Sequence, residues 1–271
     1  MSTLSESIAT FPDERLREDH VLLVEAVRRA GAIALGHFRH EPEEWEKSPG
    51  NLVSEADLQS EVCLFQHLCC ARPDYGWLSE ESDDDIARLS AGRVWVVDPI
   101  DGTRSFLDGR PEFAVAGALI VDATPVAAAV FNPATDEMFE AMRGGGARLN
   151  GATLSVSKVA NLTDARLLSG HTETQQKAWA ARFPECTIHS VSSIAYKLAL
   201  VAAGQFDALI SVWPKHEWDI ASGELLVAEA GGVASTAEGA ALEYNCPRPK
   251  LPSCIASNGL IQDALIERLA D

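Results

Sequence analysis

A short hydrophobic strand that leads directly into two carboxylates constrains this chain more than any other feature. The run Val94–Val97 consists of β-branched and aromatic residues, which predicts a buried strand, and Pro99 is expected to end it. Asp98 and Asp101 flank that proline, and Gly102 allows backbone N–H groups to approach an anion closely. Hard oxygen ligands beside free N–H groups suit a Mg²⁺ ion that holds a phosphate. A simple turn, which such residues also form, is the alternative.

Three other blocks carry residues that suit the same chemistry. Lys47–Asp57 contains two acids, Leu78–Ser82 contains a pair of glutamates, and Glu217–Asp219 precedes an apolar helical run that ends in Ala-Gly-Gly. Together with Asp98–Thr103, these blocks resemble, in the same order, those of the inositol monophosphatase superfamily of Mg²⁺-dependent, lithium-sensitive phosphomonoesterases. The Asp-Pro-Ile-Asp-Gly-Thr block is the most specific of the four.

Periodicity predicts two helices in the first part of the chain. Apolar residues at helical spacing indicate an amphipathic helix from about Val21 to Phe38. Ser54 and Asp57 are expected to cap the next helix. Its apolar side is predicted to include Val62, Phe65 and Leu68.

Strand signals divide the chain into two parts. Segments near 113–121, 126–131 and 137–142 predict antiparallel sheet, whereas strands and helices that alternate beyond about residue 160 predict an α/β layer. The length of 271 residues allows one large domain or two small ones. The resemblance implies an α/β fold, namely the αβαβα layered sandwich of the inositol monophosphatase and fructose bisphosphatase type.

The resemblance also implies an active site shared between two parts of the chain. An N-terminal α+β part, residues 1–160, would carry most metal ligands, and a C-terminal α/β part, residues 161–271, would carry Asp219 and the substrate contacts. Two or three Mg²⁺ ions are implied. Their implied ligands are Glu80, Asp98, the carbonyl of Ile100, Asp101 and Asp219.

The same resemblance implies the roles in catalysis. Glu80, Thr103 and Asp57 are the implied catalytic residues, with Thr103 and Asp57 orienting the attacking water. The N–H groups of Gly102 and Thr103, near a predicted helix start, would bind phosphate oxygens, and Lys197 would be a further substrate contact. Supporting roles are implied for Glu81 and Lys47.

Several of these residues also have a purely structural interpretation. Asp57 and Asp219 suit helix N-caps, a common use of aspartate. His216 stands beside the Asp219 block, but Mg²⁺ prefers oxygen ligands, so a structural histidine is the competing interpretation. The aspartates at 83–85 are expected to form a solvated loop and are excluded from the site.

The charge balance restricts the partners. Forty acidic residues against 22 basic ones give a net charge of −18, so the field of the protein repels nucleic acid polymers and anionic membranes. A small anionic phosphate ester is repelled as well unless metal ions reverse the local potential. The chain has no apolar run of membrane-spanning length and no evident signal sequence, and its six cysteines show no disulfide framework. These features predict a cytoplasmic protein with free thiols.

Two segments bear on the substrate. Val212 stands where animal inositol monophosphatases place an inositol-contacting glutamate, which disfavours inositol. The segment 192–204 resembles that of bacterial 3',5'-bisphosphate nucleotidases, and Lys197 matches their lysine, although Ile194 and Ala195 replace their Ser-Ser pair. These features favour hydrolysis of phosphoadenosine phosphate to AMP, with inositol 1-phosphate and then a sugar bisphosphate as alternatives.

Three further points remain open at the level of sequence. Lys197 is equally compatible with a position on a helix surface, where its aliphatic stem would lie along the helix and its ammonium group would reach water. A catalytically silent phosphate-binding regulatory protein on the same fold is an alternative of another class, which the complete set of implied ligands disfavours. The resemblance implies a homodimer.

Overall fold

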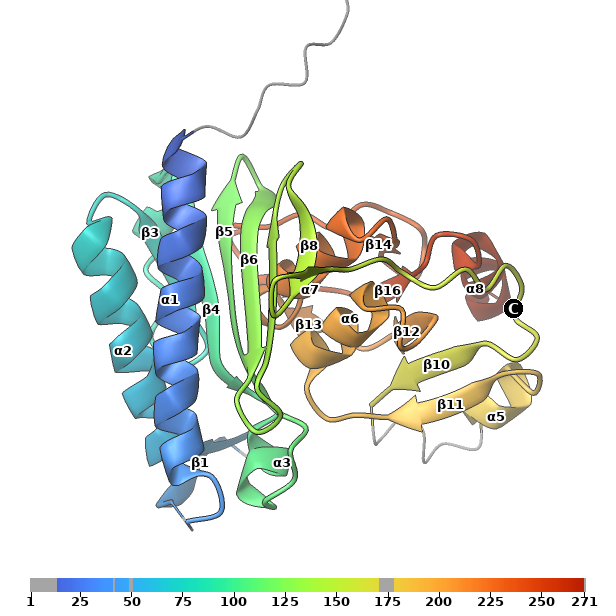
Figure 1. The fold of residues 1–271 in the computed structure, drawn as a ribbon, viewed down its shortest axis with the longest axis horizontal. Coiled ribbons are helices and arrows are strands. Elements are labelled where there is room, and N and C mark those ends of the chain that lie inside the picture. The colour runs from blue at the N-terminus through green and yellow to red at the C-terminus, as the bar shows by residue number, and fades with distance from the viewer. Residues whose placement is uncertain (1–13, 41, 49–50, 171–177, 271) are drawn as a thin grey trace, which may run out of the picture.

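Helices and sheets alternate in layers (Figure 1). The computed structural model describes residues 14–40, 42–48, 51–170 and 178–270. From left to right in Figure 1, α1 and α2 cover a seven-stranded sheet, α6 and α7 separate it from a five-stranded sheet, and α5 and α8 lie on the far side. The helices are α1 (Glu14–His37), α2 (Glu55–Ala71), α5 (Ala178–Arg182), α6 (Ile194–Ala202), α7 (Glu217–Glu229) and α8 (Gln262–Ala270). The predicted αβαβα sandwich is confirmed.

The larger sheet has the strand order β3-β4-β5-β6-β7-β8-β9. Its strands are β3 (Gly76–Ser79), β4 (Arg93–Asp101), β5 (Ala114–Val121), β6 (Thr124–Asn132), β7 (Glu137–Met142), β8 (Gly146–Leu149) and β9 (Ala152–Thr153). β3 and β4 run parallel, and every later pair is antiparallel, as predicted for the segments after Asp98. Helices cover both faces, and the interior strand β5 is therefore buried along almost its whole length.

Helix α1 packs on this sheet through one apolar stripe. The stripe consists of Leu23, Ala26, Val27, Ala30 and Ala34, which are all fully buried and lie on one face of the helix. The helix begins at Glu14, earlier than the predicted start near Val21, and Val21 is 64% exposed. In the first turns of α1, the partly buried Leu16 packs against this core, and polar contacts add to that packing.

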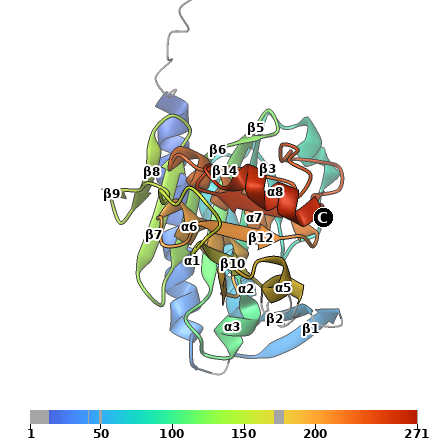
Figure 2. The same cartoon turned by 90° about the vertical axis from the view of Figure 1, so that its right-hand side faces the viewer.

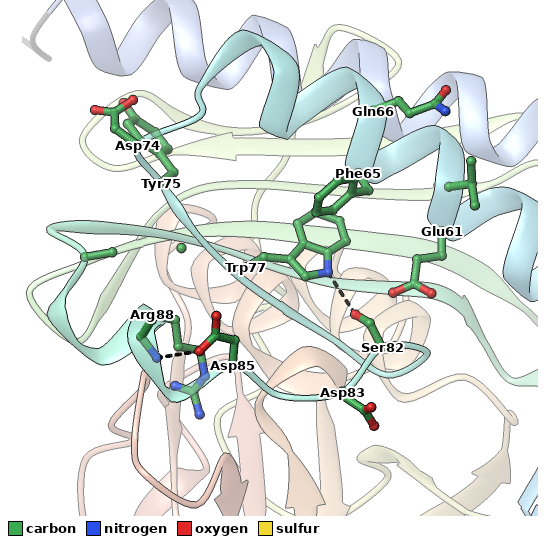
Figure 3. A pocket seen from close by; sticks show the side chains of 14 residues that line it. Glu61, Phe65, Gln66, Asp74, Tyr75, Trp77, Ser82, Asp83, Asp85 and Arg88 are labelled. Atoms are coloured by element: carbon green, nitrogen blue, oxygen red, sulfur yellow. Dashed lines mark hydrogen bonds between the residues drawn. The ribbon is translucent and has the colours of Figure 1, made fainter.

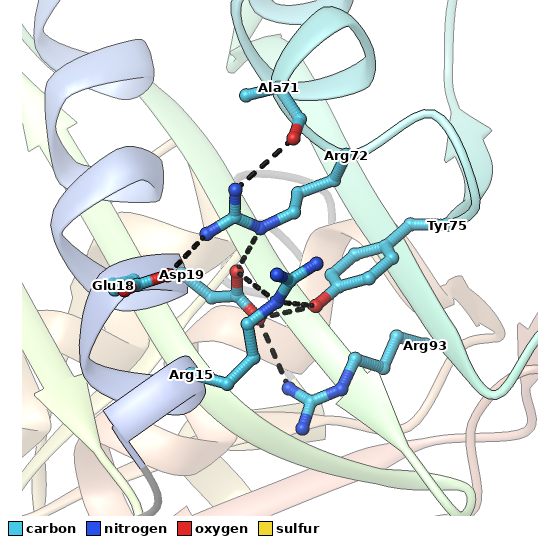
Figure 4. A network of polar contacts seen from close by, with 7 residues as sticks. All are labelled: Arg15, Glu18, Asp19, Ala71, Arg72, Tyr75 and Arg93. Carbon is cyan, nitrogen blue, oxygen red and sulfur yellow. Dashed lines mark hydrogen bonds and ion pairs between the residues drawn. The ribbon is translucent and has the colours of Figure 1, made fainter.

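A buried carboxylate supplies those contacts (Figure 4). Asp19 of α1 is fully buried. It accepts hydrogen bonds from Arg72 Nε at 2.6 Å, Tyr75 Oη at 2.7 Å and Arg93 Nη1 at 3.1 Å. Arg72 follows α2 and Arg93 begins β4, so one carboxylate joins three elements. These charged and hydroxyl donors compensate the burial of the Asp19 carboxyl group.

Helix α2 packs on the sheet with a different face from the predicted one. Its start is the predicted cap, since Ser54 N–H and Oγ donate to Asp57 Oδ2 at 2.8 and 2.6 Å. Leu68 is buried, whereas Val62 and Phe65 are 53% and 47% exposed. The buried face consists of Ala56, Asp57, Ser60, Glu61, Leu64 and Leu68. The prediction for Val62 and Phe65 was wrong because α2 carries two apolar stripes, and periodicity does not tell which one meets the sheet.

The smaller sheet has the strand order β11-β10-β12-β16-β14. Its strands are β10 (Arg166–Ser169), β11 (Thr187–Ser190), β12 (Ala208–Ser211), β14 (Val233–Ser235) and β16 (Cys254–Ser257). β10 is parallel to β11 and β12, and β16 is antiparallel to β12 and β14. Figure 2 shows α8 and α5 in front of this sheet. The predicted alternation of strands and helices beyond residue 160 is confirmed, although residues 171–177 lie outside the described part.

The two sheets share the helical layer between them as a common core. One buried cluster includes Val96 of β4, Leu226 of α7 and Leu209 of β12. A functional side chain at the end of α6 or α7 is therefore fixed relative to the larger sheet by apolar packing.

Short elements complete the fold. They are β1 (Glu44–Ser48), β2 (Asn51–Ser54), η1 (Ile86–Ser90), α3 (Thr103–Leu107), β13 (Lys215–His216) and β15 (Lys250–Leu251). No helix in the described residues is long and apolar enough to cross a membrane. All six cysteines have free thiols, as predicted.

Candidate active site

The ends of neighbouring elements bring the predicted acidic residues to one edge of the larger sheet. β3 and β4 are parallel neighbours in which Ser79 pairs with Val97. Glu80 follows Ser79 and Asp98 follows Val97, and the two acidic residues therefore lie side by side. Asp219 joins them from the first turn of α7, which packs on this sheet.

Strand β4 does not end at Pro99 as predicted. It continues to Asp101 through a bulge, because three steps along β4, from Asp98 to Asp101, face two steps along β5. Proline is tolerated at a bulge, where no ladder hydrogen bond requires its missing N–H. The irregularity turns the backbone so that Ile100 N–H donates to Asp98 Oδ1 at 3.0 Å.

Three carboxylates form a compact cluster at this edge. One oxygen each from Glu80, Asp98 and Asp219 lies within 4.8 Å of the others. Asp98 is 1% exposed, and its Oδ2 has no hydrogen-bond partner among the described residues. A buried carboxylate oxygen without a donor needs a cation, and an all-oxygen ligand set suits a hard divalent ion. These three carboxylates therefore fit a divalent ion, whereas Asp101, a further implied ligand, does not belong to the cluster.

Burial and mutual repulsion disfavour the charged forms of these groups. Burial is the largest cause in each case, followed by repulsion from the neighbouring carboxylates. The pKa of Glu80 is raised to about 8 and that of Asp219 to about 7, while the pKa of Asp98 lies well above its usual range. Without a cation, the site holds protons at neutral pH that a divalent ion would displace.

Asp101 lies outside the three-carboxylate cluster. Its Oδ2 accepts hydrogen bonds of 2.6 Å from Ser193 Oγ and from Ala195 N–H, at the start of α6. Burial raises the pKa of Asp101, and these two bonds oppose that effect. Sequence reasoning missed Ser193. Its signal was present, however, because Ser193 precedes an Ala- and Leu-rich helix and its side chain caps that helix through Tyr196 N–H.

The hydroxyl of Thr103 and the carboxylate of Asp57 lie next to each other, close to the bulge in β4. Asp57 Oδ1 lies 3.3 Å from Thr103 Oγ1, which also lies 3.0 Å from the carbonyl oxygen of Ile100. The structure therefore places the Ile100 carbonyl against Thr103. Gly102 precedes α3 with φ of +93°, and a Cβ there would lie 2.9 Å from the carbonyl oxygen of Glu112, so only glycine fits.

Lys47 and Glu81, to which the resemblance assigned supporting roles, form an ion pair. Lys47 Nζ lies 2.5 Å from Glu81 Oε2 and 3.5 Å from the Glu80 carbonyl oxygen. The side chain of Glu81 is only 3% exposed, so this ion pair is shielded on the Glu81 side. The aspartates at 83–85 are exposed, as predicted; Asp84 pairs with Arg88 and Asp85 caps η1.

Asp219 combines two uses that the sequence left open. Its Oδ2 accepts a hydrogen bond of 2.8 Å from His216 N–H and so caps α7, while the same carboxyl group belongs to the acidic cluster. The His216 ring stacks on Trp218 with a centroid separation of 4.3 Å and an interplanar angle of 10°. Burial lowers the pKa of His216, so the ring is neutral at pH 7.

Two lysines lie close enough to affect the acidic residues. Lys197 on α6 and Lys215 on β13 both oppose the rise in pKa of Asp101 and Asp219 by attraction of opposite charges. Lys197 is 3% exposed. The interpretation of Lys197 as a helix-surface lysine is therefore wrong, because α6 lies in the buried helical layer between the two sheets.

The raised pKa values predict how the stability of the metal-free protein depends on pH. A carboxyl group whose folded pKa exceeds its unfolded pKa binds more protons in the folded state, so the free energy of unfolding falls as pH rises through the folded pKa. These folded values are about 8 for Glu80 and about 7 for Asp219. In EDTA, we expect the free energy of unfolding to fall by up to about 1.4 kcal/mol per pH unit for each extra proton that the folded state holds. The Tm is expected to fall with it from about pH 6.5 and to level off near about pH 8.5, where the two groups have lost their protons.

His20 and His216 do not interfere in this range, since burial lowers the pKa of both from 6.5. The control is the same melt at saturating Mg²⁺, where bound ions keep the carboxylates deprotonated and the Tm is expected to stay level or rise. A Tm in EDTA that stays level or rises over this range would contradict the raised pKa values.

Comparison with known proteins gives a consistent result. The profile of the inositol monophosphatase family matches residues 15–271. An inositol-1-monophosphatase of Rhizobium meliloti is 40% identical over 203 residues, which are 71% of this chain and 75% of that protein. The Nus factor SuhB of Xylella fastidiosa is 33% identical over 256 residues, 90% of this chain and 91% of that protein.

Solved structures agree with the sequence relatives. The crystal structure of the extragenic suppressor protein suhB from Bartonella henselae has a TM-score of 0.82 and 33% identity, covering 92% of this chain and 97% of that one. Fold and acidic site thus define a phosphatase of a class that generally depends on metal ions. The chain belongs to the inositol monophosphatase family, whose members are phosphoric monoester hydrolases.

Proposed function

We propose that the chain is a Mg²⁺-dependent phosphomonoesterase that acts on a small phosphate ester. The observation that carries this proposal is the cluster of Glu80, Asp98 and Asp219, in which one oxygen of each lies within 4.8 Å of the others. Oδ2 of Asp98 has no hydrogen-bond partner among the described residues. These residues would hold one ion, and Asp101 beside them would contribute to a second. Bound Mg²⁺ would supply an activated water and neutralise the charge that develops on the leaving oxygen.

Residues of the chain itself would orient the attacking water and bind the phosphate oxygens. Thr103 Oγ1 can donate a hydrogen bond to Asp57, which leaves its oxygen lone pairs free to accept a hydrogen bond from a water and so to orient it. Two donors from Ser54 fix the carboxylate of Asp57. The N–H groups of Gly102 and Thr103 are the proposed contacts to the phosphate oxygens, since they start α3 beside the cluster.

Lys197 and Lys215 support a substrate with a second anionic group. Both positive charges act on Asp101 and Asp219, and so they lie at the acidic site of a protein whose overall charge is −18. Val212, where an inositol-contacting glutamate would stand, packs against a hydrophobic cluster. We therefore favour a nucleoside 3',5'-bisphosphate such as phosphoadenosine phosphate, which is converted to AMP.

Inositol 1-phosphate is the second candidate, because the Rhizobium relative is described as an inositol-1-monophosphatase. Phosphate release from phosphoadenosine phosphate, inositol 1-phosphate and fructose 1,6-bisphosphate, compared at saturating Mg²⁺, tests the substrate preference. The proposal expects the highest kcat/KM for phosphoadenosine phosphate. A higher value for inositol 1-phosphate would reverse the order of the two candidates.

Lys197→Met separates substrate contact from support of the metal site. At saturating Mg²⁺ we expect kcat/KM for phosphoadenosine phosphate to fall by about ten- to hundredfold, the loss of one charge-assisted hydrogen bond of about 1.5–3 kcal/mol, with little change for inositol 1-phosphate. Lys158→Met, in a loop outside the site, is the matched control. Equal losses on both substrates would show that Lys197 acts through Asp101 and Asp219, and the nucleotidase proposal would lose its main support.

Other predictions accompany this proposal. A homodimer, inhibition by lithium and a cytoplasmic location are proposed from the resemblance and composition described above. The division into parts 1–160 and 161–271 is proposed on the same basis; the larger sheet spans residues 76–153 and the smaller one 166–257.

A further inference from the structure

A cavity between α2 and the segment 82–91 is separate from the acidic site (Figure 3). Its volume is about 740 Å³, which is within the range of small-molecule sites. None of the residues proposed for catalysis or metal binding lines it. The cavity therefore needs an explanation of its own.

Aromatic side chains form one wall of this cavity. Phe65 meets Trp77 edge to face, with ring centroids 5.2 Å apart and an interplanar angle of 88°. Trp77 Nε1 donates to Ser82 Oγ at 3.0 Å, which fixes the indole (Figure 3). Val62 and Phe65, the exposed stripe of α2, extend this wall. Preordered aromatic surface of this kind suits an apolar or aromatic ligand body.

The polar residues of the cavity favour a cation. The carboxylates that line it belong to Glu61, Asp74, Asp83 and Asp85. The lining cation is Arg88, whose side chain is 1% exposed and already hydrogen-bonded to Asp84, Asn245 and the Cys246 carbonyl. The charge presented to a ligand is thus negative.

Glu61 provides the independent indication of a ligand. It is 9% exposed, and its Oε1 is buried without a hydrogen-bond partner in the described part of the chain. Figure 3 shows its carboxylate on the same side of α2 as Trp77 and Ser82, facing the space between them. A buried carboxylate oxygen with no donor is costly to keep, and a bound ammonium group would satisfy it.

We propose that this cavity binds a small organic cation with an aromatic or apolar body. The ammonium group binds Glu61, and the body lies against Trp77 and Phe65, where the ring faces add cation–π attraction. A small ligand is favoured over a basic protein segment because Glu61, which lines the cavity, is only 9% exposed. This site does not depend on the proposed phosphatase activity.

Calorimetric titration of the full chain with tryptamine tests the proposal. We expect saturable binding, weakened at least about tenfold in Glu61→Gln, and at least about tenfold weaker binding of tryptophol, in which a hydroxyl replaces the ammonium group. Glu267→Gln, which makes the same charge change on exposed α8, is the matched control and should bind as wild type.

Glu61→Gln keeps the shape of the side chain, so its Tm in the absence of ligand is expected to equal or exceed that of wild type. If that variant melts far below wild type, Trp77→Leu takes its place and should weaken tryptamine binding by a similar factor. No saturable binding of tryptamine, or equal binding of tryptophol, would overturn the proposal. Binding of an amphipathic Lys/Leu peptide without binding of tryptamine would overturn it in favour of a protein partner.

Discussion

Asp98→Asn is expected to lower kcat for phosphate release by about 10³-fold or more at saturating Mg²⁺ while the fold is retained. Asp98 is 1% exposed and shares the acidic cluster with Glu80 and Asp219. The amide keeps the shape of the side chain but is a weaker ligand for a hard cation. Loss of several kcal/mol of charge stabilisation in the transition state corresponds to a change of this size.

The same substitution is expected not to destabilise the metal-free protein. Burial and repulsion from Glu80 raise the pKa of Asp98 well above its usual range, so the neutral amide removes an unfavourable term. We expect the Tm in EDTA to be equal or higher, by about 2–4 °C for each kcal/mol gained. Asp263→Asn on exposed α8 is the matched control for both measurements. Full activity of Asp98→Asn would remove Asp98 from the site.

Thr103→Val is expected to lower kcat by about 10²- to 10⁴-fold, with a much smaller change in KM. The valine methyl replaces a hydroxyl that lies 3.3 Å from Asp57 Oδ1 and is proposed to orient the attacking water. The backbone N–H groups proposed to bind the phosphate remain in place, so substrate binding should persist. Steady-state kinetics against Thr124→Val, which removes an exposed hydroxyl bonded to the Asp122 carbonyl, provides the comparison. An unchanged kcat would leave Asp57 with helix capping alone and would remove Thr103 from catalysis.

The sequence predicted the elements that carry the acidic cluster because those signals are local. Val94–Val97 is apolar and β-branched, and the residues that follow it come from one short segment. The parallel pairing of β3 with β4 then places Glu80 next to Asp98, which no single segment shows. The prediction that Glu80 and Asp98 belong to one site came from the family resemblance, because the matching blocks implied that both bind the same metal ions.

The predictions that were wrong depended on packing between elements. Pro99 was expected to end β4, but the strand continues through a bulge set by its pairing with β5. The apolar residues Val62 and Phe65 were expected to face the core, yet they face outward because the other stripe of α2 meets the sheet. Lys197 was compatible with a surface position, and it is buried because α6 lies between two sheets.

The central claim is that the acidic cluster holds the metal ions on which phosphate release depends. It is tested most directly by adding Mg²⁺ to EDTA-treated protein and following phosphate release from phosphoadenosine phosphate and inositol 1-phosphate, with Mg²⁺ binding measured in parallel by calorimetry. We predict no release above the level of Asp98→Asn before Mg²⁺ is added, and recovery that saturates over the same Mg²⁺ range as binding. Full-rate release in EDTA, or undiminished Mg²⁺ binding by Asp98→Asn, would contradict the claim.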